Sequence, residues 1–165
     1  MNYCDLRPFD SNNGIGIGTT IFFSGCRFHC PNCFNKEAQD FNYGKPFDKT
    51  AEDLFISYIK DPHVQGVNLL GGEIFHQDLD IILNLVKRIT EETKKPIYCW
   101  TGFIWEDLIQ IPKAVEILNY IKVLIDGRFE EDKKNLMLKH KGSSNQREIN
   151  VQESLKSNKV ILIED

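Results

Sequence analysis

The sequence predicts an α/β fold, an open partial (βα) barrel built on a mostly parallel sheet. Apolar runs typical of buried strands alternate with helix-period segments from residue 18 to residue 126. The residues best suited to chemistry come directly after the predicted strands, at the edge of a parallel sheet where ligands bind. We expect about four to six parallel strands, too few to close a barrel of eight. The open side of such a barrel suits a large partner.

Composition is that of a single globular domain spanning residues 1–165. Hydrophobic residues make up 41% and charged residues 27%, and the net charge of −4 does not indicate nucleic acid or an anionic membrane as a partner. No apolar run approaches the length of a membrane span. The first residues, Met1 to Asp5, lack the basic and apolar regions of a signal peptide. Five cysteines without such a signal favour reduced thiols and a cytoplasmic location.

The N-terminal part is expected to begin with an irregular lead-in over residues 1–17. Residues 12–18 are rich in turn formers, and their G-x-G-x-G spacing precedes a strand instead of linking a strand to a helix. We therefore reject a dinucleotide-binding loop and expect a tight turn or a close backbone approach. Residues 18–23 form the first predicted strand, which is β-branched and aromatic. Residues 36–49 are polar and are expected to form a loop.

The next segments alternate regularly between helix and strand. Thr50 is the expected cap of a first helix that Pro62 terminates. Apolar residues from Leu79 to Ile89 recur at helical spacing and predict a second helix. The remaining expected elements are strands at 66–70, 97–101 and 120–125 and helices at 105–109 and 112–119. Residues 128–165 are expected to form a less regular C-terminal extension, with a last strand at 159–163.

Three cysteines, Cys26, Cys30 and Cys33, follow the first predicted strand at C-x3-C-x2-C spacing. A loop of this length can place three thiolates around one side of a compact metal centre. A four-iron cluster is normally held by four cysteines, so three leave one iron with an open coordination position. An open position makes a metal site reactive instead of structural. We therefore identify the three cysteines as candidate ligands of a [4Fe-4S] cluster.

Other roles for these cysteines stay open at this stage. A zinc site can combine the three thiols with His29 or a distant ligand, but the second pair typical of zinc is lacking because Cys4 and Cys99 stand alone. Disulfides are disfavoured by the odd cysteine count. His63, His76 and His140 have no metal-like spacing and are interpreted as surface or loop groups.

Gly71-Gly72-Glu73 follows the second predicted strand and is the other candidate for chemistry. Two glycines let backbone carbonyls approach a ligand closely. Glu73 can accept a charge-assisted hydrogen bond from an ammonium group. A plain strand-to-helix turn, with an acid favoured by the helix dipole, explains the tripeptide better when it is taken alone, and less well once it is paired with the cysteine loop.

Together, the cysteine motif and Gly-Gly-Glu resemble the radical S-adenosylmethionine superfamily. Within it, the chain resembles the activating proteins of anaerobic ribonucleoside-triphosphate reductases, over nearly its whole length. The short length, the Trp-Thr-Gly strand end and the Gly-Ser-Ser-Asn-Gln loop distinguish this group. The matching segments are Met1–Tyr3, Asn13–Gly14, Ser24–Cys26, Cys30–Asn35, Gly71–Gly72, Trp100–Gly102, Ile125–Gly127 and Gly142–Gln146.

The resemblance implies an oxidoreductase that cleaves S-adenosylmethionine reductively at a [4Fe-4S] cluster. The resulting 5′-deoxyadenosyl radical takes a hydrogen atom from a glycine of the reductase large subunit and leaves a glycyl radical there. An electron donor such as flavodoxin is implied as a second partner. The implied cluster ligands are Cys26, Cys30 and Cys33, and the implied S-adenosylmethionine contacts are Asn32, Cys33, Phe34, Gly71, Gly72 and Glu73, with Trp100–Gly102 and Asp126 toward the ribose.

Two departures from the family pattern stand out. The position before the third cysteine is often aromatic in the superfamily and is Asn32 here, so Phe34 is the candidate to stack on adenine. The Gly-Gly-Asp-Pro of related activases is replaced by Gly-Gly-Glu-Ile, which keeps the charge and loses the proline.

Two other functions are compatible with the cysteine motif: a small radical enzyme of the 7-carboxy-7-deazaguanine synthase type acting on a free metabolite, and a zinc-stabilised binding module.

Overall fold

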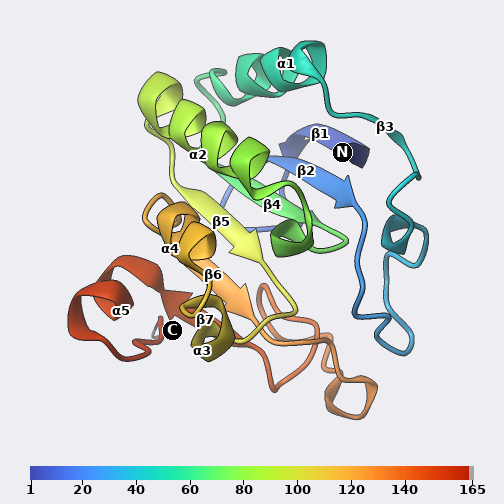
Figure 1. Cartoon of the computed structure of the whole chain (residues 1–165), viewed down its shortest axis with the longest axis vertical. Helices are drawn as coiled ribbons and strands as arrows, with labels where there is room; N and C mark the ends of the chain where they lie inside the picture. The colour runs from blue at the N-terminus through green and yellow to red at the C-terminus, as the bar shows by residue number, and fades with distance from the viewer. Residues whose placement is uncertain (164–165) are drawn as a thin grey trace.

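The protein, described here by a computed structural model over residues 1–163, is an α/β fold around an open seven-stranded sheet in the order β3-β1-β2-β4-β5-β6-β7 (Figure 1). The strands are β1 (Asn2–Asp10), β2 (Gly18–Ser24), β3 (Lys45–Pro46), β4 (Gly66–Gly71), β5 (Ile97–Trp100), β6 (Val123–Asp126) and β7 (Arg147–Asn150). The helices are α1 (Lys49–Ile59), α2 (Leu79–Thr93), α3 (Trp105–Leu108), α4 (Pro112–Leu118) and α5 (Val151–Ser157). Short 3₁₀ turns lie at Glu37–Gln39, Ile74–His76 and Glu131–Lys133.

The centre of the sheet is parallel and its two edges are antiparallel. Strands β2, β4, β5 and β6 pair in parallel, as the alternation of strand and helix predicts. At one edge β1 pairs antiparallel with β2 and with β3, and at the other edge β7 pairs antiparallel with β6. The carboxyl ends of the four parallel strands therefore meet along one edge, which is where the cysteine loop begins.

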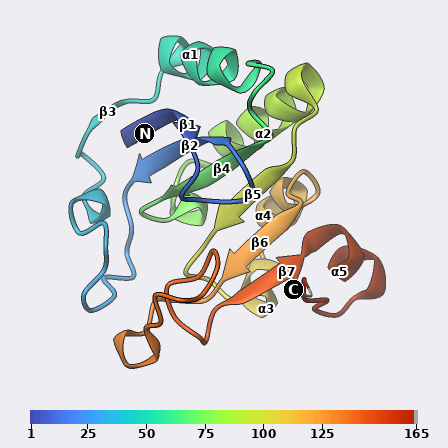
Figure 2. The same ribbon diagram turned by 180° about the vertical axis from the view of Figure 1, so that it is seen from behind.

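Helices cover one face of the sheet. Figure 1 shows α1, α2 and α4 in front of the strands, and Figure 2, seen from behind, shows the strands in front. The core lies between these two layers and includes the fully buried Phe23, Leu69, Ile82, Ile89 and Leu124. Continuous apolar runs in β2 and β6 follow from burial on both faces, which is typical of the parallel strands in such folds.

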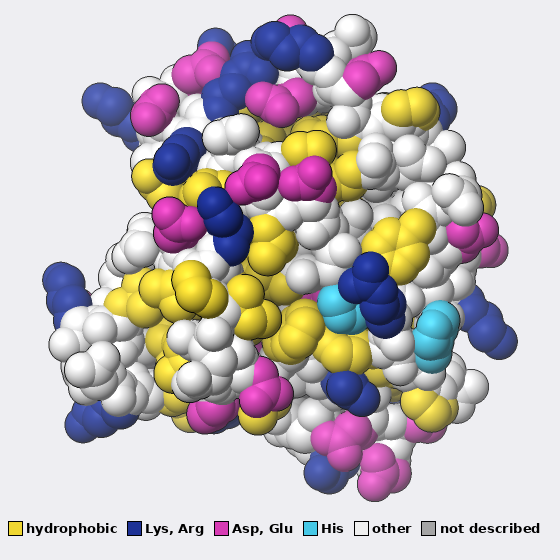
Figure 3. Space-filling view, in the orientation of Figure 1, with side chains coloured by type: hydrophobic (Ala, Val, Ile, Leu, Met, Phe, Trp, Pro, Cys, Tyr) yellow, Lys and Arg dark blue, Asp and Glu magenta, His cyan; other side chains and the backbone are white. Residues whose placement is uncertain are grey.

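Acidic and basic side chains are intermixed on the helical face, so no large patch of a single charge covers it (Figure 3). Arg88 of α2 joins the two outer helices through Glu52 and Asp53 of α1, at 3.1 and 2.6 Å. No helix within residues 1–163 combines the length and the apolar character that crossing a bilayer demands.

Residues 1–17 were expected to form an irregular lead-in, but most of them belong to β1. That strand pairs with β2 from Asn2 opposite Ser24 to Asp10 opposite Gly18, with two register shifts. Its side chains are mostly half-buried, so it lacks the continuous apolar run that marks β2. Only the turn formers after Asp10 are irregular, and their density hid the strand before them.

Three other boundaries also differ from prediction. Helix α1 is capped by Asp48, which accepts from the amide of Ala51 at 2.9 Å, and Thr50 lies inside the helix. The extension after residue 128 contains β7 and α5, so it is more regular than expected. The predicted last strand is reduced to a single bridge between Ile149 and Leu162. Residues 36–49 form a loop except for a 3₁₀ turn and the two-residue β3.

Candidate functional site

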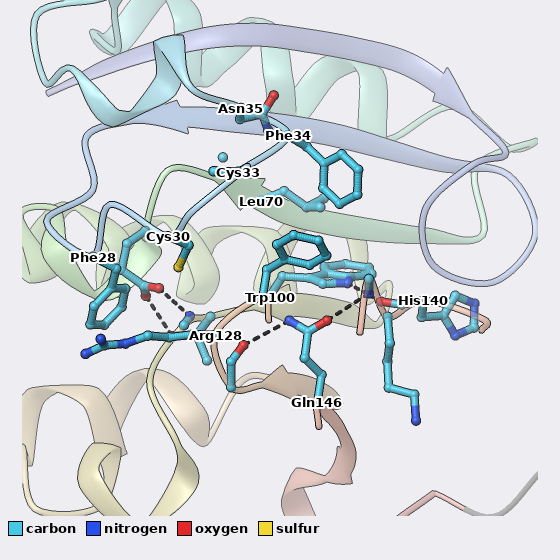
Figure 4. A pocket seen from close by; sticks show the side chains of 18 of the residues that line it. Phe28, Cys30, Cys33, Phe34, Asn35, Leu70, Trp100, Arg128, His140 and Gln146 are labelled. Atoms are coloured by element: carbon cyan, nitrogen blue, oxygen red, sulfur yellow. Dashed lines mark hydrogen bonds between the residues drawn. The ribbon is translucent and has the colours of Figure 1, made fainter. Parts of the chain in front are cut away.

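A cavity of about 400 Å³ opens at the carboxyl ends of the parallel strands. Its walls come from the cysteine loop after β2, the glycines after β4, the end of β5 and the segment 127–146 that follows β6. Figure 4 shows Cys30, Phe34, Trp100, Arg128 and Gln146 around this space. Residues that lie far apart in the sequence therefore meet where the fold predicts a ligand site.

The cysteine loop is anchored at its start. Beyond β2, the amide of Gly25 donates to Ala38 at 2.6 Å and the amide of Cys26 donates to Gln39 at 3.1 Å. Gly25 has a φ of 116°, and a Cβ there would lie 2.1 Å from the ring of Phe41. Only glycine allows this turn, because other residues rarely adopt such a φ and have no room. The turn directs the following cysteines into the cavity.

All three predicted ligands, Cys26, Cys30 and Cys33, are half-buried and line the cavity. Burial raises the pKa of the Cys26 thiol, and the amide of Phe28 opposes this rise only in part. Burial also raises the pKa of the Cys30 thiol; the nearby Cys33 adds to the rise, whereas Arg128 opposes it. None of the three thiols takes part in a disulfide within residues 1–163, and all three lie at the cavity wall.

Within residues 1–163, no three side chains of histidine, cysteine, aspartate or glutamate gather as ligands of one metal ion would. A four-iron cluster binds its cysteines through different irons, so its ligands need not converge on a single point. The shared cavity and the soft thiol donors therefore fit a cluster of this kind.

Asn32 and Phe34, on either side of Cys33, differ in their relation to the cavity. Phe34 is 67% exposed at the cavity mouth, with its ring centroid 5.1 Å from that of Phe129. Asn32 is exposed, has a φ of 57° and does not line the cavity. Phe34 is thus the aromatic surface at the mouth, whereas Asn32 is exposed outside the cavity lining.

Gly71 and Gly72 lie against the cysteine loop with no space for a side chain. A Cβ on Gly71, whose φ is 130°, would lie 2.2 Å from the backbone of Phe23. A Cβ on Gly72 would lie 2.4 Å from the carbonyl oxygen of Gly25. The amide of Gly72 donates to Phe23 and the amide of Glu73 donates to Gly25, at 2.8 and 2.9 Å. Gly71 therefore lets the end of β4 lie against β2, and Gly72 lets it hold the start of the cysteine loop at Gly25.

Glu73 is fully buried, and its carboxylate already accepts hydrogen bonds from three donors of the chain. Its carboxylate accepts from the amide of Gly102 at 2.6 Å, the amide of Phe75 at 2.9 Å and the hydroxyl of Thr101 at 2.7 Å. Desolvation raises the pKa of Glu73 to about 7, although the three donors oppose the rise. The carboxylate of Glu73, expected to be free to accept from a ligand, instead links the ends of β4 and β5 beside the cavity.

His76 and Gln77 hold the cysteine loop, although His76 was expected to be a surface or loop group and Gln77 was assigned no role. The Nδ1 atom of His76 accepts from the amide of Arg27 at 3.1 Å, which requires a neutral ring. Burial lowers the pKa of His76, and the positive charges of Arg27 and Arg128 lower it further. Both effects favour the neutral ring. Gln77 is buried and donates from Nε2 to the carbonyls of Gly25 and Glu73, both at 3.0 Å. Their position just after Gly-Gly-Glu was the available signal.

The glycine-rich loop between β1 and β2 is held by a buried polar network. Asp10 accepts from Asn13 at 2.7 Å and from Thr20 at 2.6 Å, and Asn68 donates to Thr20 at 3.0 Å. A Cβ on Gly14 would lie 2.3 Å from the side-chain oxygen of Asn68. The predicted close backbone approach is confirmed, and Asn13 lies at the cavity wall.

The predicted ribose side is only partly at the cavity. Trp100, Thr101 and Gly102 line it. Asp126 does not, because its carboxylate accepts from the amide of Trp105 at 2.8 Å and from Arg147 at 2.6 Å. Asp126 therefore braces the end of β6 and lines an adjacent pocket, which shares Gly102, Gly127 and Arg128 with the cavity.

The Gly-Ser-Ser-Asn-Gln segment is a self-supporting turn at the cavity wall. Gln146 accepts from the amides of Gly142 and Ser143, at 2.8 and 3.2 Å, and donates to the carbonyl of Gly127 at 2.9 Å (Figure 4). Asn145 donates to the carbonyl of Arg128 at 2.7 Å. The motif therefore fastens the long segment after β6 to the end of that strand.

Comparison with known proteins gives the same picture. The family described as "4Fe-4S single cluster domain" matches residues 12–149. A protein of Escherichia coli (strain K12) is 41% identical over 150 residues, which cover 88% of this chain and 96% of that protein. One of Pasteurella multocida (strain Pm70) is 40% identical, covering 88% and 95%, and one of Enterobacteria phage T4 is 34% identical, covering 89% and 92%. All three are named anaerobic ribonucleoside-triphosphate reductase-activating protein.

Proposed function

We propose that this chain, which belongs to the family of anaerobic ribonucleoside-triphosphate reductase-activating proteins and has their 4Fe-4S domain, activates such a reductase by generating a glycyl radical on it. One observation carries the proposal. A single cavity at the carboxyl edge of a parallel sheet collects Cys26, Cys30 and Cys33 together with Gly71, Gly72 and Glu73. The family explains why these two motifs occur in one short chain.

The three cysteines would hold the cluster and leave one iron for an exchangeable ligand. When bound, the reduced cluster supplies the electron for reductive cleavage of S-adenosylmethionine, and the outcome is a glycyl radical on the reductase. The chain's contribution is placement. Gly25 turns the loop inward, while His76 and Gln77 hold its backbone against the end of β4.

S-adenosylmethionine would lie in the remaining cavity space, between the thiols and the end of β5. Gly71 and Gly72 keep the backbone of β4 close to the cysteine loop. Phe34 offers the aromatic face at the mouth that suits an adenine ring. Asn32 reaches this ligand only if the cysteine loop rearranges when the cluster is inserted. Glu73 would orient the cavity wall through Thr101 and Gly102 instead of binding the ammonium group directly.

The whole chain, residues 1–165, would act as one radical S-adenosylmethionine domain in the form of a partial barrel. The parallel half of the sheet, β2 to β6, would be its working part, and the open edge would admit the glycine-bearing segment of the reductase. The electron would come from a separate cytoplasmic donor of the flavodoxin type, because the three thiols gathered at the cavity suffice for a single cluster.

The test is paramagnetic resonance under anaerobic conditions. Iron-loaded protein is mixed with S-adenosylmethionine, a chemical reductant and the reductase. A glycyl radical signal on the reductase is expected, and it should be lost when S-adenosylmethionine is omitted. Turnover of a free metabolite without any signal on the reductase would instead support the alternative metabolite enzyme, and zinc without iron in anaerobically purified protein would support a binding module.

A further inference from the structure

Residues 133–141, which we call the lysine loop, form part of the cavity rim and have no role in the function described above. The loop reads Lys-Lys-Asn-Leu-Met-Leu-Lys-His-Lys, with four lysines and no acidic residue in a chain whose net charge is −4. Asn135, Leu136, Leu138, His140 and Lys141 lie along the cavity. A macromolecule that reaches into the cavity can therefore contact this loop.

The base of the lysine loop is held firmly. Lys134 and Ser143 form a β-bridge, and the amide of Ser144 donates to the carbonyl of Lys133 at 2.9 Å. The indole of Trp100 donates to the carbonyl of His140 at 2.6 Å (Figure 4). The loop is thus presented in a set position at the end of β5, which lowers the entropic cost of binding a partner there.

The tip of the loop exposes apolar side chains instead of burying them. Leu136 is 82% exposed and Met137 is 89% exposed, and Phe34 stands exposed on the same cavity rim. Single exposed apolar residues are common, but neighbouring ones on an ordered loop beside a cavity mark an interaction site. Methionine adapts well to an irregular apolar partner.

The charge of the loop is largely free to attract a partner. Lys133 pairs with Glu130 at 3.3 Å, whereas no ion pair involving Lys134, Lys139 or Lys141 occurs in the part of the chain that the structure describes. Lys134 lies 5.7 Å from the ring centroid of Phe34, which joins the basic and apolar parts of the rim. Glu130, Glu131 and Asp132 precede the loop, so the basic charge is concentrated in the three lysines other than Lys133, around the apolar tip. Such a cluster favours an oppositely charged partner and accelerates its association.

We propose that the lysine loop docks the reductase by contacting an acidic segment with exposed apolar side chains near the glycine to be activated. This inference rests on the proposed function, because it takes the reductase as the partner. Docking at the rim would bring the partner's glycine to the cavity mouth, and the apolar tip would exclude water around it. An anionic membrane offers similar chemistry and is separated from the reductase by the experiment.

The experiment uses two substitutions at residues that do not line the cavity, Met137→Ser and Lys139→Glu. Binding of full-length protein to the immobilised reductase is measured without S-adenosylmethionine, at low and high salt. Met137→Ser is expected to raise the dissociation rate about tenfold, because an apolar anchor is lost. Lys139→Glu is expected to lower the association rate about tenfold at low salt and to weaken its salt dependence.

Matched controls are Leu54→Ser on α1 and Lys159→Glu after α5, both exposed and remote from the cavity rim. These should bind the reductase like the unchanged chain. Reductant-driven cleavage of S-adenosylmethionine without reductase should be the same in all five proteins. Loop variants that bind and activate the reductase normally would overturn the docking proposal alone. Failure of the unchanged chain to cleave S-adenosylmethionine would overturn the proposed function. Loop-dependent binding to anionic vesicles without binding to the reductase would favour the membrane.

Discussion

Two segments face each other across the cavity, and they are stabilised in different ways. The cysteine loop, residues 25–35, has one internal backbone hydrogen bond, from Cys33 to Cys30 at 3.2 Å, and is held mainly by its neighbours. The segment 127–146 has a network of its own around Gln146. Both segments hold non-glycine residues at positive φ: His29 and Asn32 in the cysteine loop, at 49° and 57°, and His140 in the opposite segment, at 62°.

This difference indicates a division of labour. A loop that contributes little to its own stability can change when a cluster is inserted, and metal binding supplies the missing free energy. A self-supporting segment keeps its shape in both states and gives the cavity a fixed wall. Substitutions in the cysteine loop should therefore alter metal content more than stability, and substitutions in the opposite segment should do the reverse.

The sharpest test of this division is Cys30→Ala. Loss of one of three ligands is expected to abolish the iron–sulfur absorption of the reconstituted protein and all cleavage of S-adenosylmethionine. The unfolding free energy of the iron-free protein should change by less than about 1 kcal/mol, because Cys30 is half-buried and outside the core. Cys4→Ser, on β1, is the control that should keep both cluster and cleavage. Retained iron in Cys30→Ala would contradict the ligand assignment.

Adding a methyl group on each side of the cavity gives the next contrast. Gly72→Ala would place a Cβ 2.4 Å from the Gly25 carbonyl oxygen and 2.6 Å from that of Ala38. Both contacts are backbone, so we expect a cost of about 3 kcal/mol in unfolding free energy and poor cluster loading. Gly142→Ala meets only side chains, with its first contact at 3.1 Å on Phe129. It should cost less than about 1 kcal/mol by denaturant titration.

The buried Glu73 should make the free energy of unfolding depend on pH. Burial raises its pKa from 4.5 to about 7, so between these values the folded chain holds a proton that the unfolded chain has released. The contribution of Glu73 is therefore present below pH 4.5 and is lost as pH rises to about 7, by roughly 3 kcal/mol in total. The replacement Glu73→Gln should flatten this slope in denaturant titrations of the iron-free protein. An unchanged slope would assign the pH dependence to other groups.

Two glutamines provide the mildest test, because each ties one of the two segments to a strand. Gln146→Ala should lower the unfolding free energy by about 1–3 kcal/mol, since it leaves the amides of Gly142 and Ser143 without an acceptor. Gln77→Ala should cost about 1 kcal/mol, since the carbonyls of Gly25 and Glu73 each lose one donor and keep the amides of Glu73 and His76. Iron bound per chain, measured after reconstitution, should fall in Gln77→Ala alone. Equal loss in both would remove the distinction between the segments.

Much of this arrangement was predictable because local patterns encode it. Continuous apolar runs identified the strands β2, β4, β5 and β6, and the helical spacing from Leu79 to Ile89 identified α2. β1 was missed because an edge strand with half-buried side chains has no such run. The hydrogen bonds of Asp126 were also not predictable, because its partner Arg147 lies 21 residues later and on another strand.

By itself, the sequence determined the ligand chemistry of this protein: three thiols at fixed spacing, glycines after a strand, and a strand–helix alternation that brings both to one edge. Only the tertiary structure decided how the acidic groups are used. Glu73 and Asp126 look like ligand contacts in the chain, but each is buried among donors from distant segments. A carboxylate loses its hydration on burial and binds whatever donors the fold supplies, and those donors cannot be read from its neighbours in the sequence.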